Sequence, residues 1–123
     1  MPTIAILGAS TDRSKFGNKA VRVFIDKGYQ VFPVNPKEKT IEGLTAYPSI
    51  SEVPVSNLDM VSFYLPPAVG LKVIAEVAKK GAKEVWLNPG AESRELVEKA
   101  EALGLNVIEA CSIVAVGSSP SLY

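Results

Sequence analysis

The sequence predicts a doubly wound α/β domain of the Rossmann-like type, in which helices cover both faces of a mostly parallel sheet to give three layers, α/β/α. Two observations carry this prediction. Short apolar runs typical of buried strands alternate along the chain with amphipathic, helix-like segments. A glycine (Gly28, Gly81 or Gly104) separates a predicted helix from the strand that begins two or three residues later. Such short connections between alternating elements form right-handed crossover units, which place neighbouring strands parallel.

The first predicted unit is the segment 4–10, Ile-Ala-Ile-Leu-Gly-Ala-Ser, with the helix that follows it. The four apolar residues form a buried strand, and Gly8 begins a tight turn. Ser14 is placed to cap a helix that begins near Lys15. The apolar residues of that helix recur at three- and four-residue spacing and define its inner face: Phe16, Ala20, Val21, Phe24 and Ile25. Free N–H groups at a glycine turn and a helix N-terminus attract phosphate, so this unit is typical of nucleotide-binding α/β domains.

The remaining elements follow the same alternation. The patterns predict further strands at 30–34, 60–65, 84–87 and 106–108, and a short extended piece at 44–47. Pro33 indicates that the second strand is edge-like, because proline has no N–H for a ladder. Pro67 suits the first position of a second helix, and the residues before Gly104 form a third. A single helical turn is predicted at 49–52, and a surface tail at 117–123.

The composition restricts the class of protein. The 123 residues suffice for one sizeable core, so we expect a single domain over residues 1–123. Thirteen basic and thirteen acidic residues cancel, which disfavours binding to nucleic acid or to an anionic membrane. No apolar run reaches membrane-spanning length, no targeting signal precedes the first strand, and the single cysteine fits a reducing, cytoplasmic location. The absence of histidine removes the commonest general base and metal ligand.

In doubly wound sheets, ligands bind beyond the carboxyl ends of the strands, where the strand order reverses. Five segments occupy such positions and should form one rim: 8–10, 35–37, 65–67, 88–90 and 110–112. Gly8 provides the tight turn, and Ser10 can add a hydroxyl contact to a phosphate. The match to the dinucleotide motif G-x-G-x-x-G is poor, because Ala9 and Ser10 replace the glycine pair and Gly17 falls too late.

The residues after the second strand narrow the ligand class. NAD-binding domains usually carry an acidic residue there, which holds the ribose hydroxyls. Asn35, Pro36 and Lys37 stand in its place, and a lysine suits a ribose-linked phosphate such as that of CoA or NADP. The alternative interpretation is a solvated lysine with no ligand.

The other strand ends also have two interpretations. Pro66, Pro67, Pro89 and Gly90 can shape a wall for a flat base, or they can simply end strands and start helices. Cys111 is the one reactive side chain of the rim, yet no histidine and no adjacent basic residue activates it. We therefore expect no catalysis through Cys111, which leaves a buried structural role or disulfide exchange with a ligand thiol. The sequence contains no metal-ligand cluster and no Walker-type loop.

Five strand-end motifs, in this order, resemble those of the small CoA-binding proteins with a Rossmann-type fold, which are similar to the CoA-binding domain of succinyl-CoA synthetase alpha subunits. The motifs are I-L-G-A-S, V-F-P-V-N-P-K, Y-L-P-P, A-K-E-V-W-L-N-P-G and E-A-C-S, and the resemblance extends from Thr3 to Val114. Many relatives carry Gln-Glu-Gly or Thr-Glu-Gly where this chain has Asn-Pro-Gly.

The resemblance implies a CoA site along the rim. Segment 8–10 would contact the pyrophosphate, 35–37 the adenosine and its 3′-phosphate, 66–67 the adenine, and 88–90 with Cys111 the pantetheine arm. The full set of expected cofactor-binding residues is Gly8, Ala9, Ser10, Ser14, Lys15, Asn35, Pro36, Lys37, Pro66, Pro67, Asn88, Pro89, Gly90 and Cys111.

The leading functional hypothesis is non-catalytic binding of coenzyme A or an acyl-CoA, as a sensor or an accessory module for a protein partner. Ligase chemistry in the related enzymes needs a phosphorylated histidine on another domain, and this sequence has no histidine. Two alternatives remain open. One is an enzyme or enzyme subunit that uses NADP or another nucleotide, and the other is an interaction domain that keeps the fold without a ligand.

Overall fold

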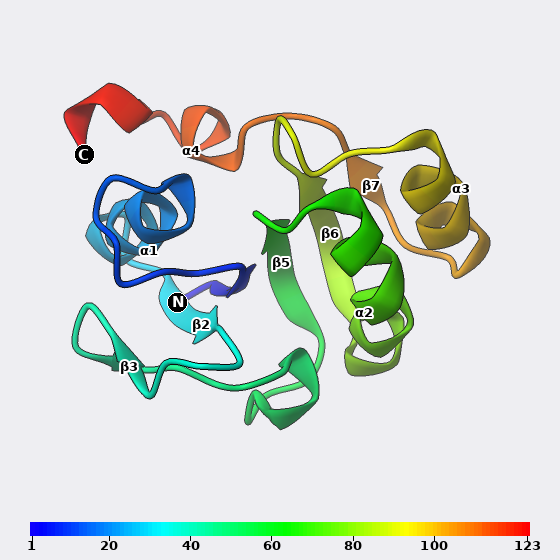
Figure 1. Ribbon diagram of the computed structural model, residues 1–123, viewed down its shortest axis with the longest axis horizontal. Coiled ribbons are helices and arrows are strands. Elements are labelled where there is room, and N and C mark those ends of the chain that lie inside the picture. The colour runs from blue at the N-terminus through cyan, green and yellow to red at the C-terminus, as the bar shows by residue number, and fades with distance from the viewer.

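The centre of the structure is a five-stranded sheet in which every pair of neighbouring strands is parallel (Figure 1). The structure is a computed structural model and describes residues 1–123. In spatial order the strands are β2 (Gln30–Val34), β1 (Thr3–Leu7), β5 (Leu58–Phe63), β6 (Ala82–Leu87) and β7 (Val107–Ile108). The chain moves from β1 outward to β2 and then returns to the other side of β1, so the strand order reverses between β1 and β5.

Helices cover both faces of this sheet (Figure 1). On one face lie α1 (Phe16–Asp26) and the short α4 (Ser112–Ala115), and on the other lie α2 (Pro67–Lys80) and α3 (Arg94–Ala102). The two faces have separate hydrophobic clusters, one with each pair of helices. This arrangement confirms the predicted three-layer, Rossmann-like α/β fold with its mostly parallel sheet.

The first strand shows why its sequence is apolar throughout. Ile4 and Ile6 face the α1 layer, whereas Ala5 and Leu7 face the α2 and α3 layer. All four side chains are buried. A parallel strand covered by helices on both faces has no solvated side, so it reads as a continuous apolar run rather than an alternating one.

β2 lies at one edge of the sheet, as Pro33 predicts. Beyond it, a small hairpin joins β3 (Thr40–Ile41) to β4 (Leu44–Thr45). The sequence predicted an extended piece here but not the hairpin. Its two turn residues, Glu42 and Gly43, both have positive φ. Glycine is a usual signal for such a turn, but glutamate is not, so the pattern was incomplete.

Several element boundaries differ from the predictions. Ser14 does not cap the first helix: Lys15 is the N-cap residue and makes no side-chain cap. Instead, the Ser14 hydroxyl donates to the Asp12 carboxylate, which also accepts the Ser14 N–H. The third strand starts at Leu58 and ends at Phe63, which is earlier than predicted at both ends. The single turn at 49–52 is present as η1 (Ile50–Glu52), although Ser49 forms no side-chain cap.

The segment predicted to be a surface tail is ordered against α1. It forms a 3-10 turn, η2 (Pro120–Leu122), whose Pro120 carbonyl accepts a hydrogen bond from Lys19. The Arg22 guanidinium lies 5.6 Å from the centre of the Tyr123 ring. A surface position was expected, but these contacts to a helix were not. None of the helices combines the length and the apolar character that crossing a bilayer requires.

Candidate functional site

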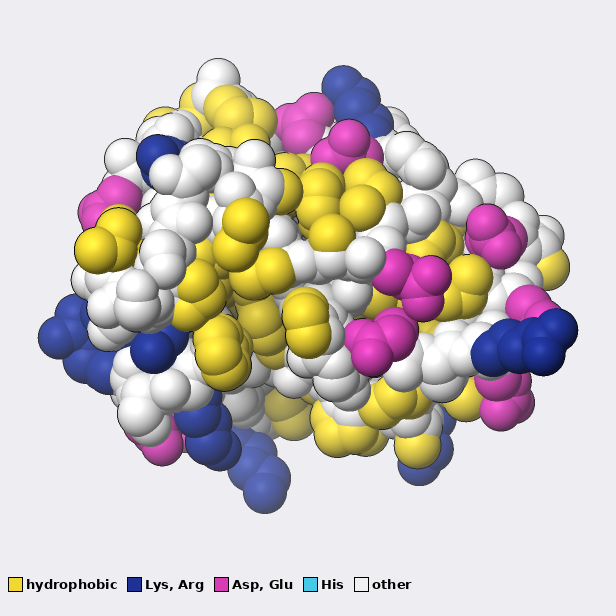
Figure 2. All heavy atoms as spheres, turned by 90° about the horizontal axis from the view of Figure 1, so that it is seen from above, with side chains coloured by type: hydrophobic (Ala, Val, Ile, Leu, Met, Phe, Trp, Pro, Cys, Tyr) yellow, Lys and Arg dark blue, Asp and Glu magenta, His cyan; other side chains and the backbone are white.

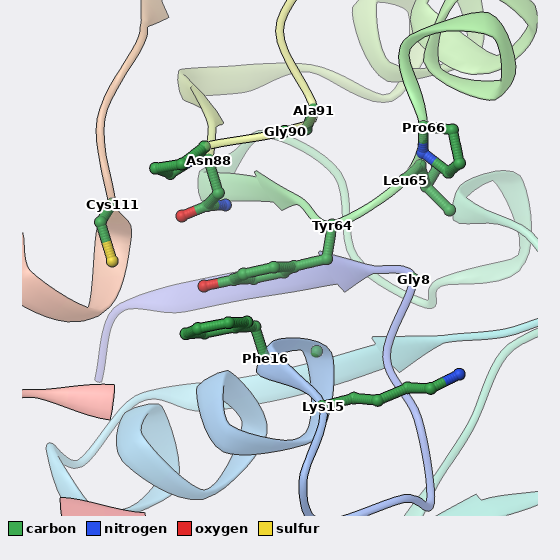
Figure 3. Close-up of a pocket in the computed structure, with 12 residues that line it drawn as sticks. Gly8, Lys15, Phe16, Tyr64, Leu65, Pro66, Asn88, Gly90, Ala91 and Cys111 are labelled. Carbon is green, nitrogen blue, oxygen red and sulfur yellow. The ribbon is translucent and has the colours of Figure 1, made fainter. Parts of the chain in front are cut away.

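A cavity of about 440 Å³ opens at the carboxyl ends of β1 and β5, where the strand order reverses (Figure 3). This is where ligands bind in open α/β sheets. In a view toward the carboxyl ends of the strands, the surface is hollowed, and apolar side chains gather around the hollow (Figure 2). The lining residues are Gly8, Lys15, Phe16, Gly17, Tyr64, Leu65, Pro66, Asn88, Pro89, Gly90, Ala91 and Cys111.

Two glycines allow the backbone to pack closely at the floor of the site. Gly8 has φ +85°, and a Cβ there would lie 2.6 Å from the Tyr64 carbonyl oxygen. A Cβ on Gly17 would collide with the carbonyl oxygen of Gly8. The end of β1, the end of β5 and the first turn of α1 therefore meet without intervening side chains. Gly17 has the close-packing role of the last glycine in dinucleotide motifs, at a spacing that the motif did not reveal.

Unpaired backbone donors surround this turn. The N–H groups of Ala9 and Ser10, and those of Phe16 and Gly17 in the first turn of α1, donate to no acceptor in the chain. The positive end of the helix dipole reinforces them. Lys15 stands beside them, is exposed and forms no ion pair. Together these groups form a cradle suited to phosphate oxygens.

Side chains from α1 hold the loop that carries these donors. Asn18 donates from Nδ2 to the Ser10 carbonyl at 2.8 Å, and it is fully buried. Arg22 donates from Nη2 to the Arg13 carbonyl at 2.8 Å, and from Nε to Asn18 at 2.7 Å. The loop between β1 and α1 is therefore fastened to the helix at two points, Ser10 and Arg13.

The opposite end of the cavity contains Tyr64, Asn88 and Cys111 (Figure 3). In Figure 3, the Tyr64 hydroxyl points toward Asn88 and Cys111, whereas the Lys15 side chain extends away from them. The cavity thus has a cationic end and a neutral, hydroxyl-bearing end. The lining also includes the apolar residues Phe16, Leu65 and Pro66.

Asn88 is 2% exposed, and its amide is occupied by the protein itself. Nδ2 donates to Ser62 Oγ and to the Phe63 carbonyl, both at 2.8 Å. Oδ1 accepts the Ser112 N–H at 2.9 Å. The residue therefore joins the ends of β5 and β6 to the start of α4. Its amide supports the shape of the cavity, and that leaves little of it for the expected pantetheine contact.

Tyr64 is the first residue after β5, and its hydroxyl lies 3.2 Å from Ser112 Oγ. Burial raises the pKa of Tyr64 to about 12, against the opposing effect of its hydrogen bond to the Ser112 hydroxyl. The phenol is therefore neutral near physiological pH. The sequence suggested core packing for Tyr64, because its aromatic ring fell inside the predicted strand.

The expected site residues divide into two groups. Those in the first group border the cavity: Gly8, Lys15, Pro66, Asn88, Pro89, Gly90 and Cys111. Those in the second group lie outside its lining: Ala9, Ser10, Ser14, Asn35, Pro36, Lys37 and Pro67. Of the second group, Ala9 has a fully buried side chain, and Pro67 is the first residue of α2.

The segment after β2 adjoins the phosphate cradle through one side chain. Asn35 donates from Nδ2 to the Ala9 carbonyl at 2.8 Å. Its Oδ1 accepts the N–H of Lys37 at 2.8 Å and that of Glu38 at 3.2 Å. Asn35 thus fixes the loop rather than facing the cavity. Lys37 is exposed, and its ammonium has no partner in the protein.

Five lining residues were not among the expected ones: Phe16, Gly17, Tyr64, Leu65 and Ala91. Phe16 matched the buried face of the first helix by its spacing, but it is 54% exposed and borders the cavity. It is the first residue of α1 and lies beyond the end of the sheet. Leu65 did belong to the rim segment 65–67, and that position was the available signal.

Comparison with known proteins identifies the family. The family model described as "CoA binding domain" matches residues 2–117. The chain belongs to the CoA-binding domain family. The match confirms the resemblance to small CoA-binding proteins.

Related proteins include ADP-forming acetate–CoA ligases. This CoA-binding domain is 30% identical over 115 residues to acetate–CoA ligase [ADP-forming] I of Archaeoglobus fulgidus, covering 85% of this chain and 17% of that protein. It is also 30% identical over 116 residues to the alpha subunit of the Pyrococcus furiosus ligase II, covering 85% of this chain and 25% of the subunit. The chain therefore spans a quarter or less of these two relatives.

Solved structures include both small and large proteins of similar fold. A conserved hypothetical protein from Pyrococcus furiosus has a TM-score of 0.85 and 38% identity, with 94% of this chain and 99% of that chain covered. A dinucleotide-forming acetyl-coenzyme A synthetase 1 from Ca. Korarchaeum cryptofilum, in complex with phosphate and ADP, has a TM-score of 0.75 and 32% identity. That match covers 88% of this chain and 25% of the synthetase. The CoA-binding domain thus has relatives of its own size as well as relatives within enzymes.

Proposed function

We propose that this protein binds coenzyme A or an acyl-CoA non-catalytically at the cavity between β1 and β5. The observation that carries the proposal is the cradle of unpaired N–H groups at Ala9, Ser10, Phe16 and Gly17, which opens beside an apolar cavity in a member of the CoA-binding domain family. CoA combines a pyrophosphate with a long, mostly uncharged arm. A phosphate cradle followed by an apolar channel suits both parts.

The orientation of the bound ligand follows from the different charges at the two ends of the cavity. The pyrophosphate would lie at the turn 8–10 and the first turn of α1, beside Lys15. The adenosine and its 3′-phosphate would extend toward Lys37, whose ammonium is free. The pantetheine arm would pass Leu65 and Pro66 toward Cys111, since these residues line the cavity.

The non-catalytic role is part of the proposal. The sequence has no histidine, so it cannot carry the phosphohistidine that the resemblance associates with ligase chemistry. Tyr64, with a pKa of about 12, is a poor general base at neutral pH. We therefore assign the protein the role of a cytoplasmic binding module that presents or senses CoA for a protein partner.

Calorimetric titration under reducing conditions tests the proposal, with CoA, dephospho-CoA, NADP and NAD as ligands. Preferential binding of CoA is the expected result. Preferential binding of NADP would instead support the nucleotide-dependent enzyme. Absence of heat with all four, together with an unchanged melting temperature, would overturn ligand binding and favour a ligand-free interaction domain.

A further inference from the structure

Four polar groups form a chain of hydrogen bonds beneath the neutral end of the cavity. Asn88 Nδ2 lies 2.8 Å from Ser62 Oγ, which lies 2.9 Å from Ser112 Oγ. Ser112 Oγ in turn lies 3.2 Å from the Tyr64 hydroxyl. Asn88, Ser62 and Ser112 are buried, whereas Tyr64 borders the cavity. Among these hydrogen-bonded groups, Tyr64 therefore has the one hydroxyl that can contact a ligand in the cavity.

The orientation of the Asn88 amide is fixed by two backbone groups. The Phe63 carbonyl can only accept a hydrogen bond, so it requires the NH₂ group at 2.8 Å. The Ser112 N–H can only donate, so it requires the amide oxygen at 2.9 Å. A flipped amide would oppose like groups at both contacts. Asn88 therefore donates to Ser62, and the direction of the chain is set at this end.

The number of hydroxyl hydrogens fixes the donor and acceptor of each remaining hydrogen bond, up to the cavity. The Ser62 hydroxyl accepts from Asn88, and its own hydrogen goes to its other partner, Ser112. Ser112 then donates to Tyr64, and the Tyr64 hydrogen is left over. Any other order along these bonds leaves the spare hydrogen on buried Ser62 or Ser112, whose hydroxyls have no further partner within hydrogen-bond distance. The spare donor therefore belongs on Tyr64, facing the cavity.

The surroundings of Tyr64 favour a neutral acceptor. The one cation of the cavity lining, Lys15, extends away from the Tyr64 hydroxyl (Figure 3). An anion at this end would lack a compensating charge and would be costly to bury. A carbonyl oxygen carries no net charge and accepts one hydrogen bond readily.

We infer that the Tyr64 hydroxyl donates a hydrogen bond to a carbonyl oxygen of the bound ligand, and this inference rests on the proposed function. CoA and its thioesters offer two sources of such an oxygen. One is an amide of the pantetheine arm, present in every CoA derivative. The other is the thioester carbonyl, present only in acyl-CoA. The second source would make Tyr64 a residue that selects acyl-CoA over free CoA.

The test compares the wild-type protein with Tyr64→Phe, which removes only the hydroxyl, in titrations with CoA, acetyl-CoA and S-ethyl-CoA. S-ethyl-CoA has an ethyl group of similar size but no thioester carbonyl. Loss of one neutral hydrogen bond should weaken binding about 3- to 10-fold. Tyr47→Phe is the matched control, because its ring packs near Phe32 and its hydroxyl has no hydrogen bond in the protein. Circular dichroism and melting temperature verify folding.

The pattern of losses separates the outcomes. Weakening confined to acetyl-CoA supports the thioester carbonyl, and equal weakening for all three ligands supports a pantetheine amide. Unchanged affinities in Tyr64→Phe, with tight binding by the wild-type protein, would overturn this inference and leave the proposed function standing. Absence of binding by the wild-type protein would overturn both.

A second substitution tests the direction of the hydrogen bond even where Tyr64→Phe fails to fold. Site-specific 3-fluorotyrosine at position 64 has nearly the same shape, and its phenol is more acidic. It is therefore a stronger donor and a weaker acceptor. Tighter binding of the carbonyl-bearing ligands is expected, and weaker binding would show that Tyr64 accepts rather than donates.

Discussion

The side-chain amide of Asn35 donates a 2.8 Å hydrogen bond to the carbonyl oxygen of Ala9. This contact joins the end of β2 to the turn after β1, although the two residues are far apart in sequence. The same side chain fixes the backbone of Lys37 through Oδ1. The phosphate cradle and the lysine that could bind a ribose phosphate are therefore positioned relative to each other by one residue.

Lys37→Ala should weaken CoA binding by about 1.5–3 kcal/mol, the range for a charged hydrogen bond, because the 3′-phosphate would lose its cation. Binding of dephospho-CoA should hardly change, since it lacks that phosphate. Calorimetry with both ligands measures the difference. Lys39→Ala is the control, because Lys39 is also exposed and lies two residues further along the loop. Equal losses for both ligands would remove the proposed role of Lys37.

Asn88→Ala should destabilise the fold strongly. It would leave the buried Phe63 carbonyl and Ser112 N–H without their side-chain partners, and each such group costs about 1–3 kcal/mol. Urea unfolding measures the loss. Asn106→Ala, which removes an exposed amide with no hydrogen bond, should have a small effect. Similar stabilities of the two variants would contradict the supporting role of Asn88.

Gly17→Ala should also destabilise the protein, even though alanine favours helices by about 1 kcal/mol over glycine. The new methyl group would collide with the Gly8 carbonyl oxygen. That oxygen is a backbone atom, and the Gly8 N–H is hydrogen-bonded to the Val34 carbonyl, so it cannot easily move aside. Gly70→Ala in α2 is the matched comparison. Its methyl group would lie 2.9 Å from Leu96 Cδ2, and a side-chain methyl can move aside. Thermal unfolding should therefore rank Gly17→Ala as the more damaging change.

Tyr64 should make stability depend on pH in the alkaline range. Its pKa is about 12 in the folded protein, above the ordinary value of about 10 for an unfolded chain. The folded state thus favours the neutral phenol, and this contribution is complete below about pH 10 and lost as the pH rises toward about 12. Over that range the wild-type protein should lose stability relative to Tyr64→Phe in urea unfolding. A constant difference between the two proteins would disprove the shift.

Much of the fold could be predicted because each helix and strand of the sheet leaves a distinct period in the sequence. The apolar run of β1 and the glycine that follows α1 at Gly28 indicate a parallel sheet directly. The hairpin turn at Glu42 was not predicted, because glutamate does not favour the positive φ that it has in this loop. Ser14 failed as a cap for a different reason, because Lys15 occupies the N-cap position and the Ser14 hydroxyl donates to Asp12 instead.

The position of the candidate cavity could be predicted from the sequence, but only part of its lining could. Strand ends locate the rim, and Gly8, Asn88 and Cys111, which were expected there, line the cavity. Periodicity shows which side of a helix faces the sheet, but it does not show where the sheet stops. Phe16 is the first residue of α1, and Tyr64 is the first residue after β5. At these positions both side chains border the cavity instead of the core.

The attachment of the loop between β1 and α1 to α1 itself has a consequence for ligand recognition. Asn18 and Arg22 donate hydrogen bonds to the carbonyls of Ser10 and Arg13. The conformational entropy of this loop is therefore lost when the chain folds and not when a ligand arrives. In the proposed complex, CoA would meet a preorganised surface, and the residues that fasten the loop from behind would contribute to affinity without touching the ligand.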